Sequence, residues 1–322
     1  MRRRNLLALA LAAGARLARA AEAPYPSGPV HLCIPGGAGS YPDQVGRLLA
    51  DGLAAAWHQP VVVENRPGAG GLVAMTAFLK AAPDGHALAL ATMSQLVFNP
   101  ALFRELPYDP QRDLAPVGTV LSGSLMLVAH PSLRIDSLSA LAAAARTRPE
   151  GLAIAVPASA SPPHVVLLML MRALRLPLTV VPFRTGSDAL AQVGAGQVPL
   201  FIDAVPVVEA QVAAGRLVGV AVTGSERVAR FPAVATVQEQ GVPGFRAETW
   251  LGVVARRGTP EAIVERVHAE LARVVHGAAF LQFAASAGGQ PLADSPQAFA
   301  ERIRADQARW QPIIREARLT AG

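Results

Sequence analysis

The stretch Val61-Val-Val-Glu-Asn-Arg-Pro-Gly-Ala-Gly-Gly71 says most about the structure of this chain. Its three leading valines are β-branched and predict a buried strand over 61–64. Pro67 ends that strand, because proline has no N–H group to donate to a neighbouring strand. The glycines then let the backbone turn sharply into a helix expected over 71–82. A strand, a glycine turn and a helix in this order leave unpaired N–H groups at the helix start, where an anion binds favourably.

Strands and helices alternate on both sides of this stretch, which predicts parallel sheets covered by helices and therefore an α/β fold. The predicted strands are 30–35, 61–64, 87–92, 117–120, 125–129, 152–156, 178–182, 198–203 and 217–223. The predicted helices are 42–57, 71–82, 137–146, 162–174, 187–194 and 205–214, followed by an extended segment over 245–256 and two C-terminal helices, from 259 and over 295–314. We expect the strands 117–120 and 125–129 to pair with each other around Ser122-Gly123-Ser124.

The N-terminus has the pattern of a secretory signal peptide, which we place at residues 1–20. Arginines at positions 2 to 4 precede an apolar run over 6–15 that is too short to span a bilayer. The Ala-Arg-Ala sequence at 18–20 then offers small residues for cleavage. An uncleaved membrane anchor is the alternative, and the Arg-Arg pair at 3–4 weakly resembles a twin-arginine export signal.

The signal peptide carries most of the positive charge of the chain. The net charge is +6, and the first twenty residues hold five arginines and no acidic residue, which leaves +1 after cleavage. A nearly neutral protein has no long-range field to attract nucleic acid, so we expect no nucleic-acid partner. The composition, 52% hydrophobic and 16% charged, supports a large core. Cys33 is the single cysteine, so an internal disulfide is excluded and we expect a buried, unreactive thiol.

The chain lacks the common catalytic and cofactor motifs. It has no Gly-x-Ser-x-Gly, His-Glu-x-x-His or Gly-x-x-x-x-Gly-Lys-Ser/Thr sequence, and its seven histidines show no metal-ligand spacing. The turn at 68–70 lacks the third glycine of a dinucleotide-binding loop. We therefore expect no catalytic residue, no metal and no cofactor, with an enzyme that uses none of these motifs as the alternative.

Small or polar residues follow several predicted strands, at the place where ligands bind in open α/β sheets. After the first strand, glycines would bring backbone N–H groups close to a carboxylate, although the same turn could simply start a helix at Pro42. The hydroxyl and amide groups around Thr92 either bind a ligand oxygen or cap the next turn. The candidate ligand-binding residues are Gly37, Ala38, Gly39, Ser40, Tyr41, Asp43, Thr92, Ser94, Gln95, Ser159, Ala160, Ser161, His164, Thr185 and Asp203.

The second half of this candidate set also has plainer interpretations. Ser161 ahead of Pro162 is a typical helix N-cap arrangement. Arg184, beside Thr185, could pair with a carboxylate or remain solvated at the surface. Asp203 ends an apolar strand, where its carboxylate could accept a hydrogen bond from a ligand hydroxyl or amine, or cap the next helix.

Several motifs together resemble the Bug family, the periplasmic solute-binding proteins of tripartite tricarboxylate transporters. The opening stretch matches the family's VVVENRPGAGG signature, and the other motifs extend the resemblance over nearly the whole chain after the signal peptide. These motifs are Tyr-Pro-x-x-Pro at 25–29, Asn-Pro-Ala-Leu at 99–102, Leu-Pro-Tyr-Asp-Pro at 106–110, Pro-Phe-Arg at 182–184, Gly-Gln-Val at 196–198, Phe-Ile-Asp at 201–203, Ala-Val-Thr at 221–223, Gly-Val-Pro-Gly-Phe at 241–245 and Thr-Trp-x-Gly at 249–252.

The resemblance implies a type II periplasmic binding protein fold with two lobes, each a mainly parallel sheet flanked by helices. Residues 24–128 and 226–322 would form the first lobe, and residues 129–225 the second. Such proteins are monomers that close around a small organic carboxylate in the periplasm and deliver it unchanged to a membrane permease. In this family, backbone N–H groups and trapped water hold the carboxylates. An exported enzyme for a small acid, or a ligand sensor for a membrane receptor, remains the alternative.

Some residues depart from the family pattern. The first loop usually ends Gly-Gly-Ser/Ala-Thr-Asp and here ends Gly-Ser-Tyr-Pro-Asp at 39–43, so a glycine and the threonine hydroxyl are lost and the Tyr41 ring is gained. Ala158 and Ala160 replace glycines of the second-lobe loop. Ala204 replaces the asparagine that usually follows the aspartate. We therefore predict a narrower and more apolar pocket than is usual in the family. We also predict that the Tyr41 ring stacks on an aromatic acid.

Overall fold

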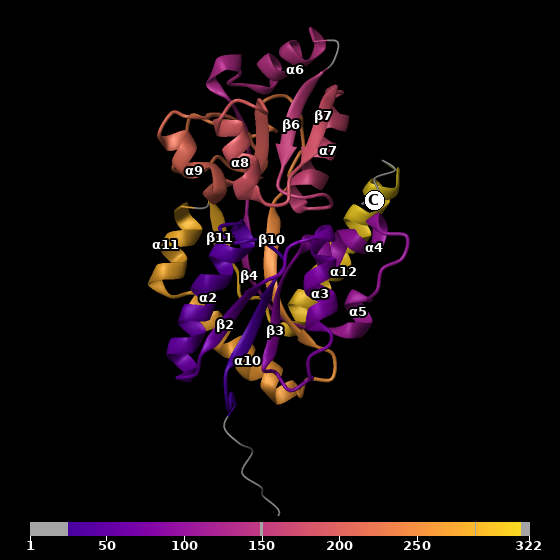
Figure 1. The fold of residues 1–322 in the computed structure, drawn as a ribbon, viewed down its shortest axis with the longest axis vertical. Coiled ribbons are helices and arrows are strands. Elements are labelled where there is room, and N and C mark those ends of the chain that lie inside the picture. The colour runs from indigo at the N-terminus through magenta and orange to yellow at the C-terminus, as the bar shows by residue number, and fades with distance from the viewer. Residues whose placement is uncertain (1–24, 149–150, 287, 317–322) are drawn as a thin grey trace, which may run out of the picture.

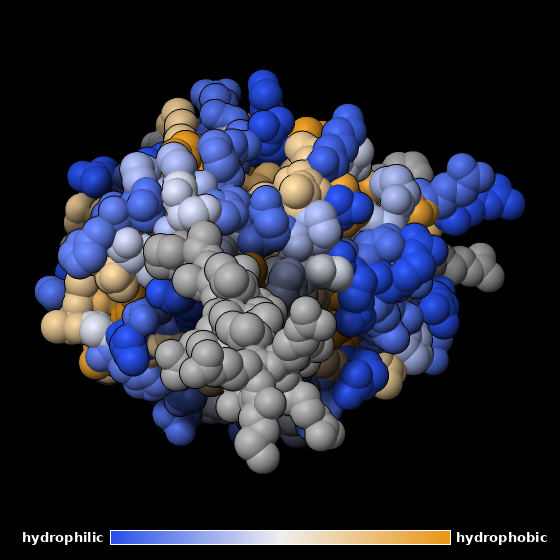
Figure 2. Space-filling view, turned by 90° about the horizontal axis from the view of Figure 1, so that it is seen from below, coloured by the Kyte–Doolittle hydropathy of each residue, from blue (hydrophilic) through white to orange (hydrophobic). Residues whose placement is uncertain are grey.

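The computed structural model describes residues 25–148, 151–286 and 288–316, which form two α/β lobes, one above the other in Figure 1. The predicted signal peptide at 1–20 lies outside the described residues. None of the helices described has the length and apolar character needed to cross a membrane. The face of the first lobe that points away from the second is mostly hydrophilic where its atoms can be seen, with hydrophobic residues scattered over it (Figure 2).

The first sheet has the strand order β11-β4-β10-β3-β1-β2. Its strands are β1 (Val30–Ile34), β2 (Val61–Asn65), β3 (Ala87–Thr92), β4 (Leu114–Gly123), β10 (Thr249–Arg256) and β11 (Gly289–Pro291). The strand predicted from the opening valines is confirmed as β2, which pairs in parallel with β1. β4 runs in the same direction as β1, β2 and β3, whereas β10 is antiparallel to both of its neighbours and β11 is antiparallel to β4.

The second sheet has the order β7-β6-β8-β5-β9. Its strands are β5 (Leu125–Ala129), β6 (Leu152–Val156), β7 (Leu178–Pro182), β8 (Leu200–Ala204) and β9 (Val218–Val222). β6, β7 and β8 are parallel, and β5 is antiparallel to β8 and β9. The two-lobed α/β class is therefore confirmed. In each sheet most strands share one direction, and a strand that belongs to the connection between the lobes, β10 or β5, runs against them.

The expected pairing of 117–120 with 125–129 is wrong. β4 belongs to the first sheet and β5 to the second, so the chain passes straight from one lobe to the other at Ser124. The reason is that the start of β5 finds its hydrogen-bond partner at Thr223, far along the chain. Leu125 N donates to Thr223 Oγ1 at 3.0 Å, and Thr223 Oγ1 in turn donates to Ala247 O at 2.8 Å. Thr223, fully buried, thus ties together the two segments that cross between the lobes.

Helices cover both sheets as the periodicity predicts. In the first lobe they are α2 (Tyr41–Trp57), α3 (Leu72–Phe78), a π-helical turn η2 (Ser94–Phe98), α4 (Asn99–Leu102), α5 (Pro110–Asp113), α10 (Glu261–Val275), α11 (Ala278–Ser286) and α12 (Pro296–Glu316). In the second they are α6 (Leu138–Arg146), α7 (Pro162–Leu174), α8 (Gly186–Gly194) and α9 (Val205–Ala213). The helix predicted over 71–82 is shorter than expected, since α3 ends at Phe78.

The segment after β9 lies against the second sheet. Val222 forms an isolated bridge with Thr236, and Gln240 accepts a hydrogen bond from Leu138 N at 2.7 Å and donates to Val220 O at 2.8 Å. The predicted lobe limits, 24–128 with 226–322 and 129–225, stay a prediction. These contacts favour a second lobe that continues to about residue 247, where the chain returns to the first sheet as β10.

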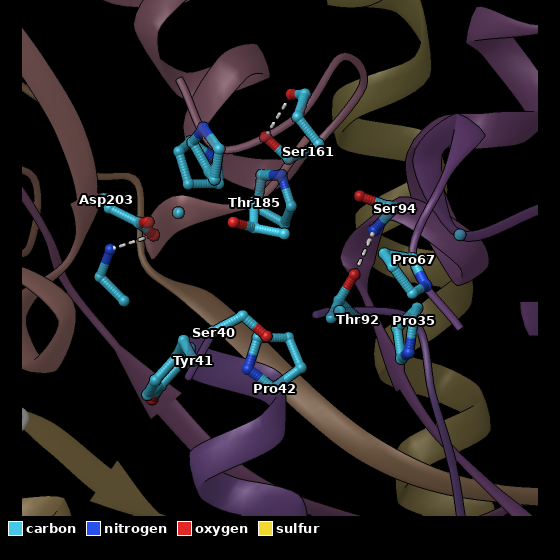
Figure 3. A pocket seen from close by; sticks show the side chains of 18 of the residues that line it. Pro35, Ser40, Tyr41, Pro42, Pro67, Thr92, Ser94, Ser161, Thr185 and Asp203 are labelled. Atoms are coloured by element: carbon cyan, nitrogen blue, oxygen red, sulfur yellow. Dashed lines mark hydrogen bonds between the residues drawn. The ribbon is translucent and has the colours of Figure 1, made fainter. Parts of the chain in front are cut away.

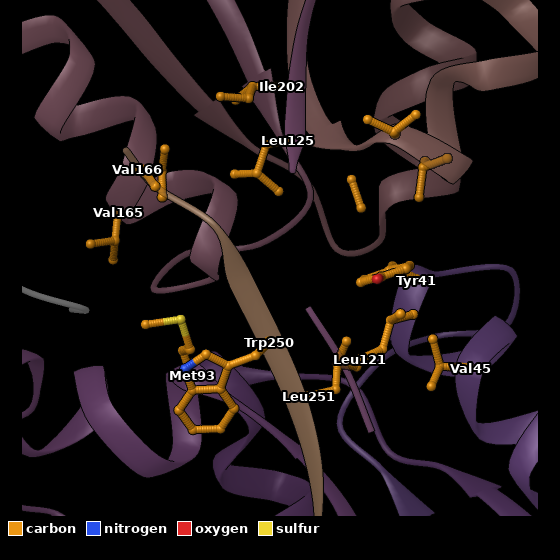
Figure 4. Close-up of a cluster of buried hydrophobic side chains, with 14 of the residues drawn as sticks. Tyr41, Val45, Met93, Leu121, Leu125, Val165, Val166, Ile202, Trp250 and Leu251 are labelled. Carbon is orange, nitrogen blue, oxygen red and sulfur yellow. The ribbon is translucent and has the colours of Figure 1, made fainter. Parts of the chain in front are cut away.

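Apolar side chains from both lobes approach one another near the crossing segments (Figure 4). Leu125 and Ile202 come from the second sheet, and Trp250 and Leu251 come from β10 of the first. All four are buried, with at most 4% of their surface exposed. Because burial of apolar surface removes it from water, this cluster holds the crossing strands in place beside the cavity described next.

Candidate functional site

A cavity of about 110 Å³ lies between the two lobes (Figure 3). Its wall is built mainly from turns that follow the carboxyl ends of strands, as expected for an open α/β sheet. The first lobe contributes residues from 35–42 after β1, 67–71 after β2 and 92–95 around the end of β3, together with 249–251 of β10. The second lobe contributes residues from 157–163 after β6, 184–186 after β7 and 203–204 at the end of β8, together with Leu125.

The two lobes touch across this cavity. Ser94 Oγ of the first lobe donates to Ala160 O of the second at 2.8 Å. A Cβ atom added to Gly37 would lie 2.6 Å from Thr185 Cγ2, so the first loop and the start of α8 leave no room for another methyl group. The two lobes are therefore in direct contact beside the cavity.

The structure brings together many of the residues predicted from the sequence. The predicted candidates on the cavity wall are Gly37, Ser40, Tyr41, Thr92, Ser94, Gln95, Ser161, Thr185 and Asp203. The predicted candidates that do not line it are Ala38, Gly39, Asp43, Ser159, Ala160 and His164. That any of them contacts a ligand stays a prediction.

Asp43 lies behind the first loop and holds it in shape. Its carboxylate accepts hydrogen bonds from Gly39 N at 2.8 Å, Asn65 Nδ2 at 2.9 Å and Arg47 Nε at 3.1 Å. Burial alone would raise the pKa of Asp43, but these hydrogen bonds outweigh it and lower the pKa below its ordinary value. Asp43 therefore remains ionised and positions backbone N–H groups instead of facing the cavity.

His164 has the equivalent role in the second lobe. Its Nδ1 accepts a hydrogen bond from Ala160 N at 3.1 Å, and burial lowers the pKa of the imidazole. Ala160 has a positive φ of 59°, in the left-handed region where glycine is more usual. The contacts with His164 and Ser94 hold this loop in that conformation.

The hydroxyl groups on the wall are mostly engaged within the protein. Thr92 Oγ1 donates to Gln95 Oε1 at 3.0 Å, and Ser161 Oγ donates to Ala158 O at 2.7 Å. Ser94 Oγ makes the bond between the lobes, and Gln95 Nε2 donates to Gly70 O at 2.8 Å. These side chains can accept hydrogen bonds from a ligand, but their protons already hold the turns together.

Backbone N–H groups and the guanidinium of Arg184 are donors on the wall that remain for a ligand. Within the described ranges, no protein acceptor contacts the N–H groups of Gly36, Gly37 or Gly186, which all line the cavity. α2 and α8 point their N-termini at it, and α8 begins behind its N-cap Thr185. Helix N-termini carry a partial positive charge that favours an anion. α7 offers fewer donors because its first residues are prolines.

Ser40 and Tyr41 differ from the other polar residues of the wall. The hydroxyl oxygens of both are buried and have no hydrogen-bond partner among the described residues. The Tyr41 ring stacks on Phe283 of α11, with centroids 6.3 Å apart, and only 7% of its surface is exposed. Burial raises the pKa of the phenol. One ring face is therefore already covered, and stacking of Tyr41 on an aromatic ligand stays a prediction.

Asp203 is the one acidic side chain among the described residues that line the cavity. It is 5% exposed, and its Oδ1 accepts a hydrogen bond from Ala204 N at 2.7 Å. Burial raises the pKa of Asp203 to about 7, and the Ala204 hydrogen bond opposes this shift. The carboxyl group therefore changes its charge near neutral pH.

Sequence reasoning missed the contribution of β10 to the wall. β10 is far from β3 and β4 in sequence but lies between them in the first sheet. This position brings Thr249, Trp250 and Leu251 to the cavity wall. Trp250 Nε1 donates to Asp306 Oδ2 of α12 at 2.6 Å, which fixes the indole. The glycine turn at 68–71 also lines the cavity, and its strand-turn-helix pattern was the available signal for it.

Two α/β lobes joined by crossing strands, with amide-rich turns around a cavity between them, define a two-lobed solute-binding protein. The model of the tripartite tricarboxylate transporter family receptor matches residues 45–319, so the chain belongs to this family. It is 32% identical to Protein BugT of Bordetella pertussis over 293 residues, which cover 91% of this chain and 90% of BugT.

Solved structures show the same fold. The structure of R. palustris Rpa4515 with adipate matches with a TM-score of 0.87 and 29% identity, covering 91% of this chain and 98% of that one. MatC from Rhodopseudomonas palustris with bound malate matches with a TM-score of 0.84 and 29% identity, covering 90% of this chain and 100% of MatC. The expected resemblance to the Bug family is confirmed, and the family is one of transport receptors.

Proposed function

We propose that the protein is an extracytoplasmic solute-binding protein that captures a small organic carboxylate between its lobes. It then delivers this ligand to a membrane permease of the tripartite tricarboxylate type. The observation that carries the proposal is the cavity between the lobes, lined by Gly36, Gly37 and Gly186, whose N–H groups have no acceptor among the described residues. The adipate and malate bound by two relatives of the same fold support a carboxylate as the ligand.

The size of the cavity fits a small acid. One water molecule needs roughly 10–15 Å³ by the same kind of measure, so about 110 Å³ is room for a compact organic acid or for several waters. Amide donors at helix N-termini stabilise a carboxylate without a paired cation, and closure strengthens these hydrogen bonds by excluding bulk water.

An exported enzyme and a sensor for a membrane receptor are the competing functions. Within the described ranges, the cavity wall holds no histidine, lysine or cysteine. Its acidic side chain, Asp203, has no serine or threonine hydroxyl of the described residues within hydrogen-bond distance to activate as a nucleophile. The receptor family to which the chain belongs favours transport. A sensor would share the site and differ only in its membrane partner. Co-purification from membranes that contain both a permease and a receptor would distinguish transport from sensing.

The test is a thermal-shift screen of the protein against mono- and dicarboxylates of three to six carbons. A ligand that binds only the folded form raises its stability by about 2.7 kcal/mol at one hundred times its Kd. We expect at least one acid to do so and to be recovered unchanged by mass spectrometry. No stabilisation by any acid, or conversion of one into a product, refutes the proposal.

Gly37→Ala tests whether closure is part of binding. The added Cβ would lie 2.6 Å from Thr185 Cγ2, so closing the lobes must displace the N-cap of α8. We expect the affinity for the stabilising acid to fall roughly tenfold, about 1.4 kcal/mol. Gly28→Ala is the matched control, because a Cβ there meets nothing within 4 Å. Equal affinities of the two variants would refute a role for lobe closure.

A further inference from the structure

We propose that Asp203 determines ligand specificity by accepting a hydrogen bond from a hydroxyl or ammonium group of the bound acid. This inference rests on the proposed function and adds the class of ligand. The preferred ligand is a carboxylate with a hydrogen-bond donor at its other end, and a dicarboxylate that places its second carboxylate against Asp203 is disfavoured.

The Asp203 carboxylate has unsatisfied hydrogen-bonding capacity. Its two oxygens can accept about four hydrogen bonds. Oδ1 receives one from Ala204 N, and no other described residue donates to either oxygen. Buried carboxylates are normally paired or fully hydrogen-bonded, because an unpaired charge out of water is costly. The cavity is the side from which a further donor can reach Asp203, whose carboxylate points into it (Figure 3).

The neighbours of Asp203 leave that side open and carry no charge. A Cβ on Gly186 of α8 would lie 2.5 Å from Asp203 Oδ2, so glycine at this position keeps the carboxylate uncovered. Pro157, after β6, lies beside Gly186, and Met126 of β5 is opposite Asp203 in the sheet. Only burial and the Ala204 hydrogen bond alter the pKa of Asp203, so no charged side chain offsets its negative charge. Arg184 lines the same cavity without acting on it.

The first loop supplies the complement. Gly36 and Gly37 line the cavity with N–H groups that no described residue accepts, and Ser40 has a buried hydroxyl without a partner among the described residues. Free donors together with a single acidic acceptor match a ligand that carries both a carboxylate and a hydrogen-bond donor. A second carboxylate at the Asp203 end would meet a like charge at short range, which is unfavourable.

The test compares acids that share one carboxylate and differ at the other end. Butyrate, 4-hydroxybutyrate, 4-aminobutyrate and succinate form one set, and the sets of three, five and six carbons repeat the comparison. Affinities are measured by calorimetry at pH 8, where Asp203 is ionised. We expect the best hydroxy or amino acid to bind at least tenfold more tightly than the dicarboxylate of the same length. The hydroxy and amino members of each set show which donor is preferred.

Asp203→Asn is the decisive variant, because its amide keeps the shape and can donate to a carboxylate. We expect it to lower the preference for the hydroxy or amino acid over the dicarboxylate at least tenfold. Asp188→Asn is the matched control, since it removes a charge from an exposed position at the start of α8, away from the cavity wall. This control should leave the preference unchanged.

A pH series on the unaltered protein tests the inference without a substitution. As pH falls below about 7, Asp203 takes up a proton and can itself donate, so discrimination against dicarboxylates should decrease. Equal binding of the dicarboxylate at pH 8, or an unchanged preference in Asp203→Asn, overturns the role of Asp203 while leaving carboxylate capture intact. If no acid binds at all, the proposed function fails, and this inference fails with it.

Discussion

Replacement of Asp203 by asparagine should stabilise the protein above pH 7. Burial raises the folded-state pKa of Asp203 from 3.8 to about 7. Between these values the folded protein keeps a proton that the unfolded chain has lost, so the stability of the folded state falls as pH rises through this window. Above pH 7 the folded protein must hold an ionised carboxylate without a cation, whereas asparagine carries no charge.

The size of the effect follows from the two pKa values. One pKa unit corresponds to about 1.36 kcal/mol, so the full difference amounts to about 4 kcal/mol as an upper bound. Entry of water into the cavity reduces this, and we expect Asp203→Asn to be more stable by roughly 1–3 kcal/mol at pH 8. The side-chain carbonyl oxygen of the substituted amide can still accept the Ala204 hydrogen bond, so that contact is retained.

The assay is urea denaturation of both proteins at intervals from pH 4 to pH 8.5, without added acid. The difference in free energy of unfolding should be near zero at about pH 4, grow up to about pH 7 and then level off. Asp188→Asn serves as the control for loss of an exposed carboxylate. A variant that is less stable than the unaltered protein at pH 8, or a difference that does not change with pH, would refute the reasoning.

Three further substitutions test the contacts that build the fold and the site. Gly252→Ala places a Cβ 2.3 Å from Phe299 Cζ in the buried core, so it should destabilise the protein by about 1–3 kcal/mol and lower its Tm. An unchanged Tm would contradict the close packing of Gly252 against Phe299. Asp43→Ala leaves Gly39 N of the first loop and Asn65 Nδ2 of β2 without their acceptor and should cost about 2 kcal/mol in urea denaturation, together with weaker ligand binding. Unchanged stability and binding would show that the carboxylate is dispensable. Ser94→Ala removes the hydrogen bond to Ala160 O between the lobes and should speed ligand release about fivefold, measured by stopped-flow tryptophan fluorescence. An unchanged release rate would show that this hydrogen bond does not hold the lobes together around the ligand.

Much of the fold follows from local signals in the chain. The β-branched run at 61–63 and Pro67 predict a strand that ends where β2 does, to within one residue. The apolar positions Val264, Val267 and Leu271 recur at helical spacing, and all three are buried on α10. These predictions succeed because side-chain periodicity and the missing N–H of proline act within a few residues.

The pairing of strands depends on distant partners and was predicted less well. β4 and β5 are adjacent in sequence and apolar, which favoured a hairpin, yet they belong to different lobes. Thr223 and β10, both far along the chain from them, supply the partners that draw them apart. Nothing local to residues 117–129 encodes those partners, so sequence periodicity cannot distinguish the two outcomes.

The position of the site was predictable, because the carboxyl ends of parallel strands meet at one edge of a sheet. The turns after β1, β3, β6, β7 and β8 were therefore chosen from the sequence, and all of them reach the cavity. Which groups in those turns remain available to a ligand is decided by tertiary contacts. The Ser94 hydroxyl is engaged by the other lobe, Asp43 faces backward into its own loop, and Asp203 is left with one donor among the described residues. A hydrogen bond needs its partner within about 3 Å, and the partners here come together only when the two lobes fold and close.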